Sequence, residues 1–249
     1  MRIAALYDIH GNLPALESVL NEVRQAGVDQ IVIGGDVLPG PMPLETLTCL
    51  LDLDMPVTFI RGNGDRVVHA VMTGGDISSE VPEPYAEPVR WNARQLRSEH
   101  ERVLASWPPT LRIEIRGLGE VLFCHATPRN DTDCFTRLTP EDRLLAIFES
   151  ANASVVVCGH SHMQFDRTIG QTRVVNAGSV GMPFQEPGAY WLLLGPDVQL
   201  RRTAYDLAKA AERIRGTEYP QAEDFAAHNI LQPPSEAVML EAFSKVPLK

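Results

Sequence analysis

Three features are scarce or absent in this chain of 249 residues: paired cysteines, an excess of positive charge, and long apolar runs. The four cysteines lie far apart, without the short paired spacing of zinc ribbons or redox dithiols. We therefore expect free thiols that pack as small apolar side chains and carry no chemistry. They are Cys49, Cys124, Cys134 and Cys158.

The charge and the hydropathy argue against two classes of partner. The formal net charge is −10, so there is no basic face for a long phosphate backbone, whereas small phosphate esters remain compatible if metal ions supply local positive charge. No apolar stretch approaches the roughly 20 residues of a membrane span. The chain passes from Met1 and Arg2 straight into an apolar run, without a signal-peptide pattern. We expect a cytoplasmic protein that binds neither membranes nor long nucleic acids.

What the sequence does contain is five short apolar runs that each lead to an Asp, Asn or His. The runs are continuous rather than alternating, as in strands buried on both faces of a layered α/β domain. In open α/β sheets the functional site lies beyond the carboxyl ends of the strands, so the residues that follow the runs are expected to converge. The runs cover residues 3–7, 31–33, 57–60, 121–124 and 155–158.

The polar residues after these runs are of metal-ligand type. Asp8 and His10 are two residues apart, so in an extended segment their side chains face the same way and one ion can take both. The carboxylate of Asp36 has two oxygens with which it can bridge two ions about 3.5 to 4 Å apart. Mixed oxygen and nitrogen ligands suit Mn, Fe, Zn or Ni better than calcium. The sequence therefore predicts a two-metal site built from Asp8, His10, Asp36, Asn63, His125, His160 and His162.

The remaining pattern predicts the elements around this site. Helices are expected at residues 12–27, 44–53, 85–107 and 140–152, and antiparallel strands of a second sheet at 165–169, 173–175, 190–194 and 198–203. From Asp206 onward, two or three short helices lack any cluster of metal ligands. They could cover the domain or join a second subunit, so the sequence leaves a homo-oligomer open.

At these residues the chain resembles the calcineurin-like metallophosphoesterases. The matching motifs follow the family's order, and the resemblance covers most of residues 1–205. Residues 176–183, with Ala177 in place of the usual Pro, are similar to a segment of the small bacterial and archaeal phosphodiesterase branch. The motifs are Asp8-Ile9-His10, Gly35-Asp36, Gly62-Asn63-Gly64-Asp65, His125 and Gly159-His160-Ser161-His162.

The resemblance implies an α/β fold, a four-layer αββα sandwich with two mixed β-sheets, over residues 1–205, followed by a C-terminal helical extension at 206–249. It implies two divalent transition-metal ions, Mn²⁺ first, with Fe, Zn or Ni as alternatives. A hydroxide between them would attack a small phosphate ester, with Asp36, Asn63 and His125 as the catalytic residues. One ion would be held by Asp8, His10, Asp36 and His162, and the other by Asp36, Asn63, His125 and His160.

One position departs from the family pattern. Many members carry a His after the Gly-Asn pair, where it can protonate the leaving group, and this chain has Gly64. General-acid help is worth about 10²- to 10⁴-fold, so esters with poor leaving groups should suffer most. The branch that the chain resembles is associated with phosphodiesterase activity, so we expect a preference for small diesters or activated substrates. Asp65 and His69 could form a helical pair that replaces the acid.

Two arginines are candidates for substrate binding, and two alternative functions remain open. Arg129 and Arg66 are the candidates for binding substrate phosphate, because guanidinium groups match phosphate oxygens. One alternative is a dinucleoside polyphosphate hydrolase or a nuclease, the latter disfavoured by the acidity. The other is a non-catalytic interaction module on the same fold, which would have no chemical need for the complete ligand set.

Overall fold

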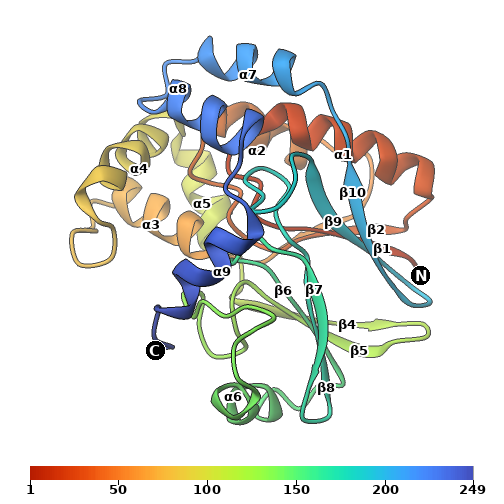
Figure 1. The fold of residues 1–249 in the computed structure, drawn as a ribbon. Helices are drawn as coiled ribbons and strands as arrows, with labels where there is room; N and C mark the ends of the chain where they lie inside the picture. The colour runs from red at the N-terminus through yellow and green to blue at the C-terminus, as the bar shows by residue number, and fades with distance from the viewer. Residues whose placement is uncertain (249) are drawn as a thin grey trace.

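The computed structural model describes residues 1–248 and contains two five-stranded mixed sheets packed face to face (Figure 1). The first has the order β10-β9-β1-β2-β3, in which β1, β2 and β3 are parallel and β9 and β10 antiparallel. The second has the order β4-β5-β6-β8-β7, with a parallel centre and antiparallel edges. The strands of the first sheet are β1 Ile3–Leu6, β2 Gln30–Ile33, β3 Val57–Phe59, β9 Ala189–Leu194 and β10 Val198–Thr203. Those of the second are β4 Thr110–Ile115, β5 Gly119–Cys124, β6 Val155–Cys158, β7 Phe165–Ile169 and β8 Thr172–Asn176.

The continuous apolar runs are explained by burial on both faces of each sheet. In β1, Ile3 and Ala5 face the second sheet and join the core between the sheets, whereas Ala4 and Leu6 face outward into the core under the helices. In β5, Phe123 points into the same inter-sheet core and Leu122 points outward. Each strand therefore contributes to two apolar layers at once.

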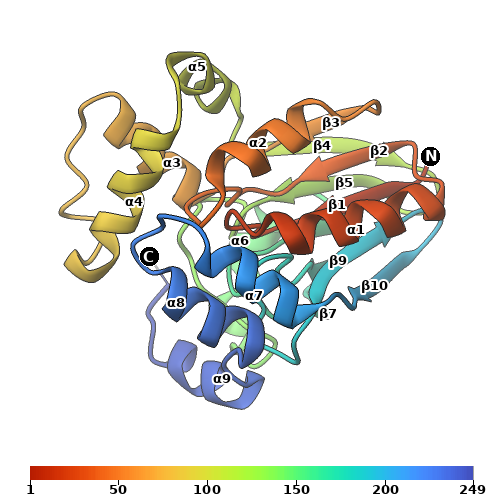
Figure 2. The same cartoon turned by 90° about the horizontal axis from the view of Figure 1, so that it is seen from above.

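Helices cover the outer face of each sheet and complete four layers. Helices α1 (Leu13–Ala26) and α2 (Pro43–Leu51) pack on the first sheet, and the short α6 (Leu145–Glu149) packs on the second (Figures 1 and 2). The Asn12 side chain accepts a hydrogen bond from the backbone of α1 at its start, and Gly27 ends α1 in the left-handed conformation. The predicted αββα sandwich with two mixed sheets is confirmed, but the placing of strands 190–194 and 198–203 in the second sheet is wrong, because β9 pairs with β1 and brings β10 into the first sheet.

The predicted helix at 140–152 is shorter than expected. A 3₁₀ turn, η1 (Glu141–Arg143), precedes α6, and the helical conformation ends at Glu149. Pro140 and the left-handed residue Asn152 (φ 47°) bracket this segment and keep it short.

The single helix predicted at 85–107 is wrong, because the chain forms two helices there. Helix α4 (Glu83–Gln95) and α5 (Ser98–Ser106) are separated by extended backbone, and the Nδ1 atom of His100 caps α5 by accepting from the Arg97 N–H at 3.0 Å. The break allows Trp107 to reach β3 and stack on Phe59, with ring centroids 4.7 Å apart. Both helices pack against α3 (Asn63–Met72), which follows the third strand.

The C-terminal helices pack on the rest of the same chain. Helix α7 (Leu207–Arg215) contacts α1, and Arg213 donates to Glu17 at 2.6 Å. An apolar cluster joins the C-terminal segment to α4, with Tyr219 edge-on to Trp91 at 5.5 Å. The division of the chain at residue 205 stays a prediction. The segment also contains α8 (Ala222–Phe225), the π-helical η2 (Ala226–Leu231) and α9 (Glu236–Ser244).

No helix within residues 1–248 combines the length and the apolar character that crossing a bilayer would require.

Candidate metal centre and active site

The polar residues predicted from the strand ends converge at one edge of the sandwich. The segments that follow β1 and β2 stay hydrogen-bonded to each other. The Asp8 N–H donates to the Gly35 carbonyl at 3.1 Å, and the His10 N–H donates to the backbone carbonyl of Asp36 at 2.9 Å. Two groups of ligand-type side chains result, each with its ligand atoms within 4.8 Å of one another. The first is Asp8, His10 and His162, and the second is Asp36, His125 and His160.

The backbone at this edge is held in an uncommon conformation. Among the described residues, six non-glycine residues have positive φ, and five of them are predicted ligands. This left-handed region costs free energy for residues with a Cβ, although Asp, Asn and His enter it more readily than others. Strain concentrated in this way is typical of a functional site. The five are Asp8 (φ 53°), His10 (47°), Asp36 (51°), His160 (66°) and His162 (57°).

In the first group, three atoms with lone pairs face one another: Nε2 of His10, Nε2 of His162 and Oδ1 of Asp8. The Nδ1 atoms of His10 and His162 lie 3.1 Å from the Pro39 carbonyl and 2.7 Å from the Met182 carbonyl. A carbonyl only accepts, so each Nδ1 carries the proton and each Nε2 presents a lone pair. The two Nε2 atoms are 3.3 Å apart, and the His162 Nε2 is 3.3 Å from Asp8 Oδ1.

The second group has the same organisation. His125 donates from Nδ1 to the Gly34 carbonyl at 3.0 Å, so its Nε2 points inward and is an acceptor when the ring is neutral. The Asn63 amide tip directed at this Nε2 is 3.1 Å from it and 3.0 Å from the Nδ1 of His160. With the amide oxygen inward, all three atoms are acceptors and a cation among them resolves the conflict; with the amide turned over, its nitrogen would donate to both rings.

Asp36 lies between the two groups. Its Oδ2 is 3.7 Å from His10 Nε2 and 3.5 Å from His125 Nε2, whereas its Oδ1 accepts from the Gly64 N–H at 2.7 Å. Burial alone would raise the pKa of this carboxyl, but the charge and hydrogen bond of His125, reinforced by His10, lower it below its usual range. Asp36 is therefore ionised and placed to serve both groups.

The donor set fits a pair of divalent cations. Asp8 Oδ1 is fully buried and has no hydrogen-bond partner, which is costly for a carboxylate unless a cation meets it. Ligand atoms bound at about 2.1 Å to one ion lie about 3.0 to 3.4 Å apart in octahedral or tetrahedral geometry. The closest separations here, 3.0, 3.1 and 3.3 Å, fall in this range. Burial, together with the charge of His125, lowers the pKa of His160 to about 4, which keeps its ring neutral and able to bind a metal.

The Asn-Ala-Gly-Ser segment at 176–179 supports the ligand loops from behind. The Asn176 amide donates to the Gly159 carbonyl at 2.7 Å, just before the His160 loop. The Ser179 hydroxyl donates to the Asp8 carbonyl at 2.7 Å and accepts from the Met182 N–H at 2.7 Å. These bonds orient residues that themselves point at the site.

The suggested pairing of Asp65 with His69 is not formed. The Asp65 carboxylate accepts from three backbone N–H groups, those of Asp36 at 2.8 Å, Leu38 at 3.0 Å and Gly62 at 3.0 Å. Within residues 1–248 no hydrogen bond or ion pair joins it to His69. Asp65 instead fixes the turn that carries Asp36.

A cavity of about 370 Å³ opens beside His125, and both predicted substrate-binding arginines line it. Arg66 is paired with Asp131 (2.7 Å) and with Glu80, and Arg129 donates to Asp133 at 2.6 Å. A third lining residue, Arg61, was not identified from the sequence. The available signal was its position directly before Gly62-Asn63, at the end of a predicted strand.

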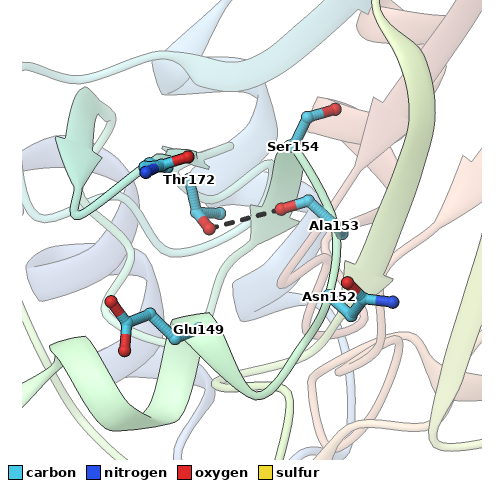
Figure 3. Close-up of a pocket in the computed structure, with 6 residues that line it drawn as sticks. Glu149, Asn152, Ala153, Ser154 and Thr172 are labelled. Atoms are coloured by element: carbon cyan, nitrogen blue, oxygen red, sulfur yellow. Dashed lines mark hydrogen bonds between the residues drawn. The ribbon is translucent and has the colours of Figure 1, made fainter.

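A second cavity, of about 390 Å³, lies away from this chemistry (Figure 3). Glu149, Ser154 and Thr172 are among its lining residues, and the Thr172 hydroxyl donates to the Ala153 carbonyl at 3.2 Å. It sits at the start of β6, whereas the ligand loop follows the end of the same strand. The cavity is therefore unrelated to the metal centre.

Comparison with known proteins agrees with this geometry. A family model for the calcineurin-like phosphoesterase superfamily domain matches residues 1–195. The chain belongs to this superfamily. Calcineurin-like phosphoesterases use a dinuclear divalent metal centre, and the two ligand groups described above are where this chain can hold one. The protein is accordingly a metal-dependent phosphoester hydrolase.

Individual relatives of this phosphoesterase are distant but extend over nearly the whole chain. An uncharacterized protein of Methanocaldococcus jannaschii is 28% identical over 240 residues, covering 88% of this chain and 94% of that protein. A metallophosphoesterase from Sphaerobacter thermophilus has a similar structure, with a TM-score of 0.67 and 26% identity over 91% of this chain and 97% of that one. A hypothetical protein from Pyrococcus horikoshii OT3 has a TM-score of 0.78 and 21% identity over 94% and 99% of the two chains, and shows the same fold.

Proposed function

We propose that the protein is a phosphodiesterase that hydrolyses small phosphate diesters. The observation that carries this proposal is the position of Gly64, where many family members have a His that can protonate the leaving group. A Cβ atom at Gly64 would lie 2.2 Å from the Leu38 carbonyl oxygen and 3.0 Å from Asp36 Oδ1. No side chain fits there, so substrates whose leaving groups depart unprotonated are favoured.

The proposed metal ligands are those predicted from the sequence, with Mn²⁺ as the proposed metal. One ion would be held by Asp8, His10, Asp36 and His162, and the other by Asp36, Asn63, His125 and His160. The described geometry supports this division, because the inward-facing atoms form two groups that share Asp36. When bound, the ions act as Lewis acids toward phosphoryl oxygens and make water more acidic.

The protein's own residues would organise the site around the ions. His10, His125 and His162 each donate from Nδ1 to a backbone carbonyl, so the inner nitrogen of each ring is directed at the site and is an acceptor whenever the ring is neutral. Asp36 is locked by the Gly64 N–H, which leaves its other oxygen directed between the two groups. Such fixed orientation lowers the reorganisation needed during the reaction.

The test compares three substrates with the Mn²⁺-loaded protein: bis(p-nitrophenyl) phosphate, p-nitrophenyl phosphate and glycerol phosphate. The aryl diester and aryl monoester share a leaving group, so their ratio reports the preference for diesters. The alkyl monoester has a poor leaving group and reports the missing acid. We expect the highest kcat/KM for the diester and the lowest for glycerol phosphate. Equal efficiency on the alkyl monoester and the aryl diester would contradict the proposal.

A further inference from the structure

We infer that the cavity beside His125 binds a second phosphate group of the substrate, linked through oxygen to the phosphate that reacts. The inference rests on the proposed function and narrows it to substrates whose leaving group is itself a phosphate, as in dinucleoside polyphosphates. The cavity adjoins the candidate metal centre, because His125 is one of its lining residues. Its volume of about 370 Å³ is within the range of small-ligand sites.

Arg61 is the residue that gives this cavity its preference for an anion. It lies between β3 and α3, and its backbone N–H donates to the Pro108 carbonyl at 2.9 Å, which holds the residue at the cavity wall. Its Nε atom is buried and has no hydrogen-bond partner. No carboxylate within residues 1–248 lies at ion-pair distance from its guanidinium group. The Nε atom is buried but the side chain as a whole is partly exposed, so the guanidinium can pair with an anion that enters the cavity, and a phosphate oxygen would offset its charge.

The other two arginines of the cavity are already matched by acidic side chains. Arg66 is held between Asp131 and Glu80, and the Nε of Arg129 donates to Asp133. Arg61 is therefore the arginine of this cavity whose charge no carboxylate offsets. In a chain with a net charge of −10, this local positive charge beside the metal ligands distinguishes the cavity from the acidic surface as a whole.

Gly64 points independently to the same substrate class. In the reaction, the oxygen of water bonds to the reacting phosphorus and the bridging P–O bond breaks. The leaving phosphate keeps the electron pair as an oxyanion, and the proton from water passes to solvent. A phosphate leaving group has a pKa near 6 and needs no protonation at neutral pH. The absence of a side chain at Gly64 therefore costs such a substrate little, and Arg61 would stabilise the charge that it gains.

The experiment uses the full-length, Mn²⁺-loaded protein and three variants: R61Q, R61K and R116Q. Arg116 is exposed in the β4–β5 turn, at the end of the hairpin remote from His125, and it makes no hydrogen bond or ion pair within the described chain, so R116Q is the matched control. Two substrates are compared. Diadenosine tetraphosphate has a phosphate leaving group, whereas bis(p-nitrophenyl) phosphate has a good leaving group without a second phosphate.

For R61Q we expect kcat/KM on diadenosine tetraphosphate to fall about tenfold or more, as when a charged hydrogen bond is lost. The efficiency on bis(p-nitrophenyl) phosphate should fall by less than this, because its leaving group carries no second phosphate for Arg61 to bind. R61K should restore part of the activity, because it keeps the charge without the planar fork, and R116Q should match the wild type on both substrates. A binding measurement gives an independent readout: the Kd of ADP for metal-stripped protein should rise about tenfold in R61Q and not in R116Q.

The two proposals fail in different ways. A wild-type enzyme that cleaves bis(p-nitrophenyl) phosphate but not diadenosine tetraphosphate overturns the inference and leaves the phosphodiesterase proposal standing. Equal losses of R61Q on both substrates assign Arg61 a structural role and also overturn it. If R61Q does not fold, R61K decides: a Kd for ADP and an efficiency on diadenosine tetraphosphate that both equal those of the wild type reject the inference, because loss of the planar guanidinium fork should weaken both. A wild-type protein that cleaves neither substrate contradicts the proposed function itself.

Discussion

Replacing Asp36 by Asn should remove both metal ions at once, and the structure shows why the amide cannot substitute for the carboxylate. Asp36 Oδ1 accepts from the Gly64 N–H at 2.7 Å, and Oδ2 lies among the ring nitrogens of His10 and His125. An amide that keeps its oxygen toward Gly64 turns its NH₂ group toward the ions. The opposite orientation places NH₂ against the Gly64 N–H, with two donors in contact and a buried hydrogen bond lost.

Each orientation carries a penalty that can be estimated. Leaving a buried donor unsatisfied costs about 1–3 kcal/mol, a factor of roughly 5 to 150 in population, so the NH₂ group faces the ions in most molecules. Losing an outer residue that merely orients a ligand already lowers metal affinity about 10- to 100-fold. The loss of a shared ligand should be at least as large at each of the two sites.

The assay measures metal content and activity together. We expect D36N, dialysed against buffer with trace Mn²⁺, to retain less than one metal equivalent by elemental analysis, and its kcat/KM on bis(p-nitrophenyl) phosphate to fall at least about 100-fold. The control is D54N, which removes an exposed carboxylate that makes no hydrogen bond to any residue from 1 to 248. If D36N keeps two equivalents of metal and the wild-type rate of ester cleavage, the shared-ligand reasoning is refuted.

Three other predictions concern the same site. G64H should lower the thermal unfolding temperature, by the equivalent of about 1–3 kcal/mol, because a Cβ would meet the Leu38 carbonyl at 2.2 Å; an unchanged melting temperature with improved cleavage of glycerol phosphate would count against it. Chelation by EDTA should lower the melting temperature and Mn²⁺ should restore it, since Asp8 Oδ1 is buried without a partner; no shift in a thermal scan would oppose this. Metal uptake should release a proton from His125. Burial disfavours the charged ring, but the charge and hydrogen bond of Asp36 outweigh this effect and raise the pKa of His125 to about 10. Metal affinity should therefore rise with pH between about pH 6 and 8, and calorimetry in buffers of different ionisation enthalpy that detects no proton release would contradict it.

The sequence was sufficient to predict structure where the local residue pattern and the sheet topology agree. The continuous apolar runs predicted doubly buried strands, and the structure explains them by the alternation of Ile3 and Ala5 with Ala4 and Leu6 between two cores. Because parallel strands end at one edge, the predicted ligands were expected to lie together, and they do. Their roles as metal ligands, and the roles of Arg66 and Arg129 toward substrate, stay predictions, as does the cytoplasmic location.

The failures have tertiary causes. At the break between α4 and α5 the His100 side chain accepts from the Arg97 N–H, and α5 then ends where Trp107 stacks on Phe59, a contact between residues far apart in the sequence. Helical periodicity continues across the break, and His is an unusual cap, so no local signal marked the end. Likewise, the position of Arg61 before Gly62-Asn63 placed it near the site, but its lack of a carboxylate partner could not be predicted, because this depends on where Asp131, Glu80 and Asp133 lie in three dimensions.

The left-handed main chain at the five predicted ligand residues has a consequence for how the enzyme would acquire its metals. The conformation of the backbone, and not the cations, sets the direction of these side chains. Metal binding should therefore require no refolding, and ions can bind to or dissociate from the folded protein. A preformed site of this kind does little to select among similar transition metals by its geometry. The metal that is bound should therefore depend on which metals are available. Cultures grown on different trace-element mixtures should yield the same fold carrying different metals, with catalytic power that varies accordingly.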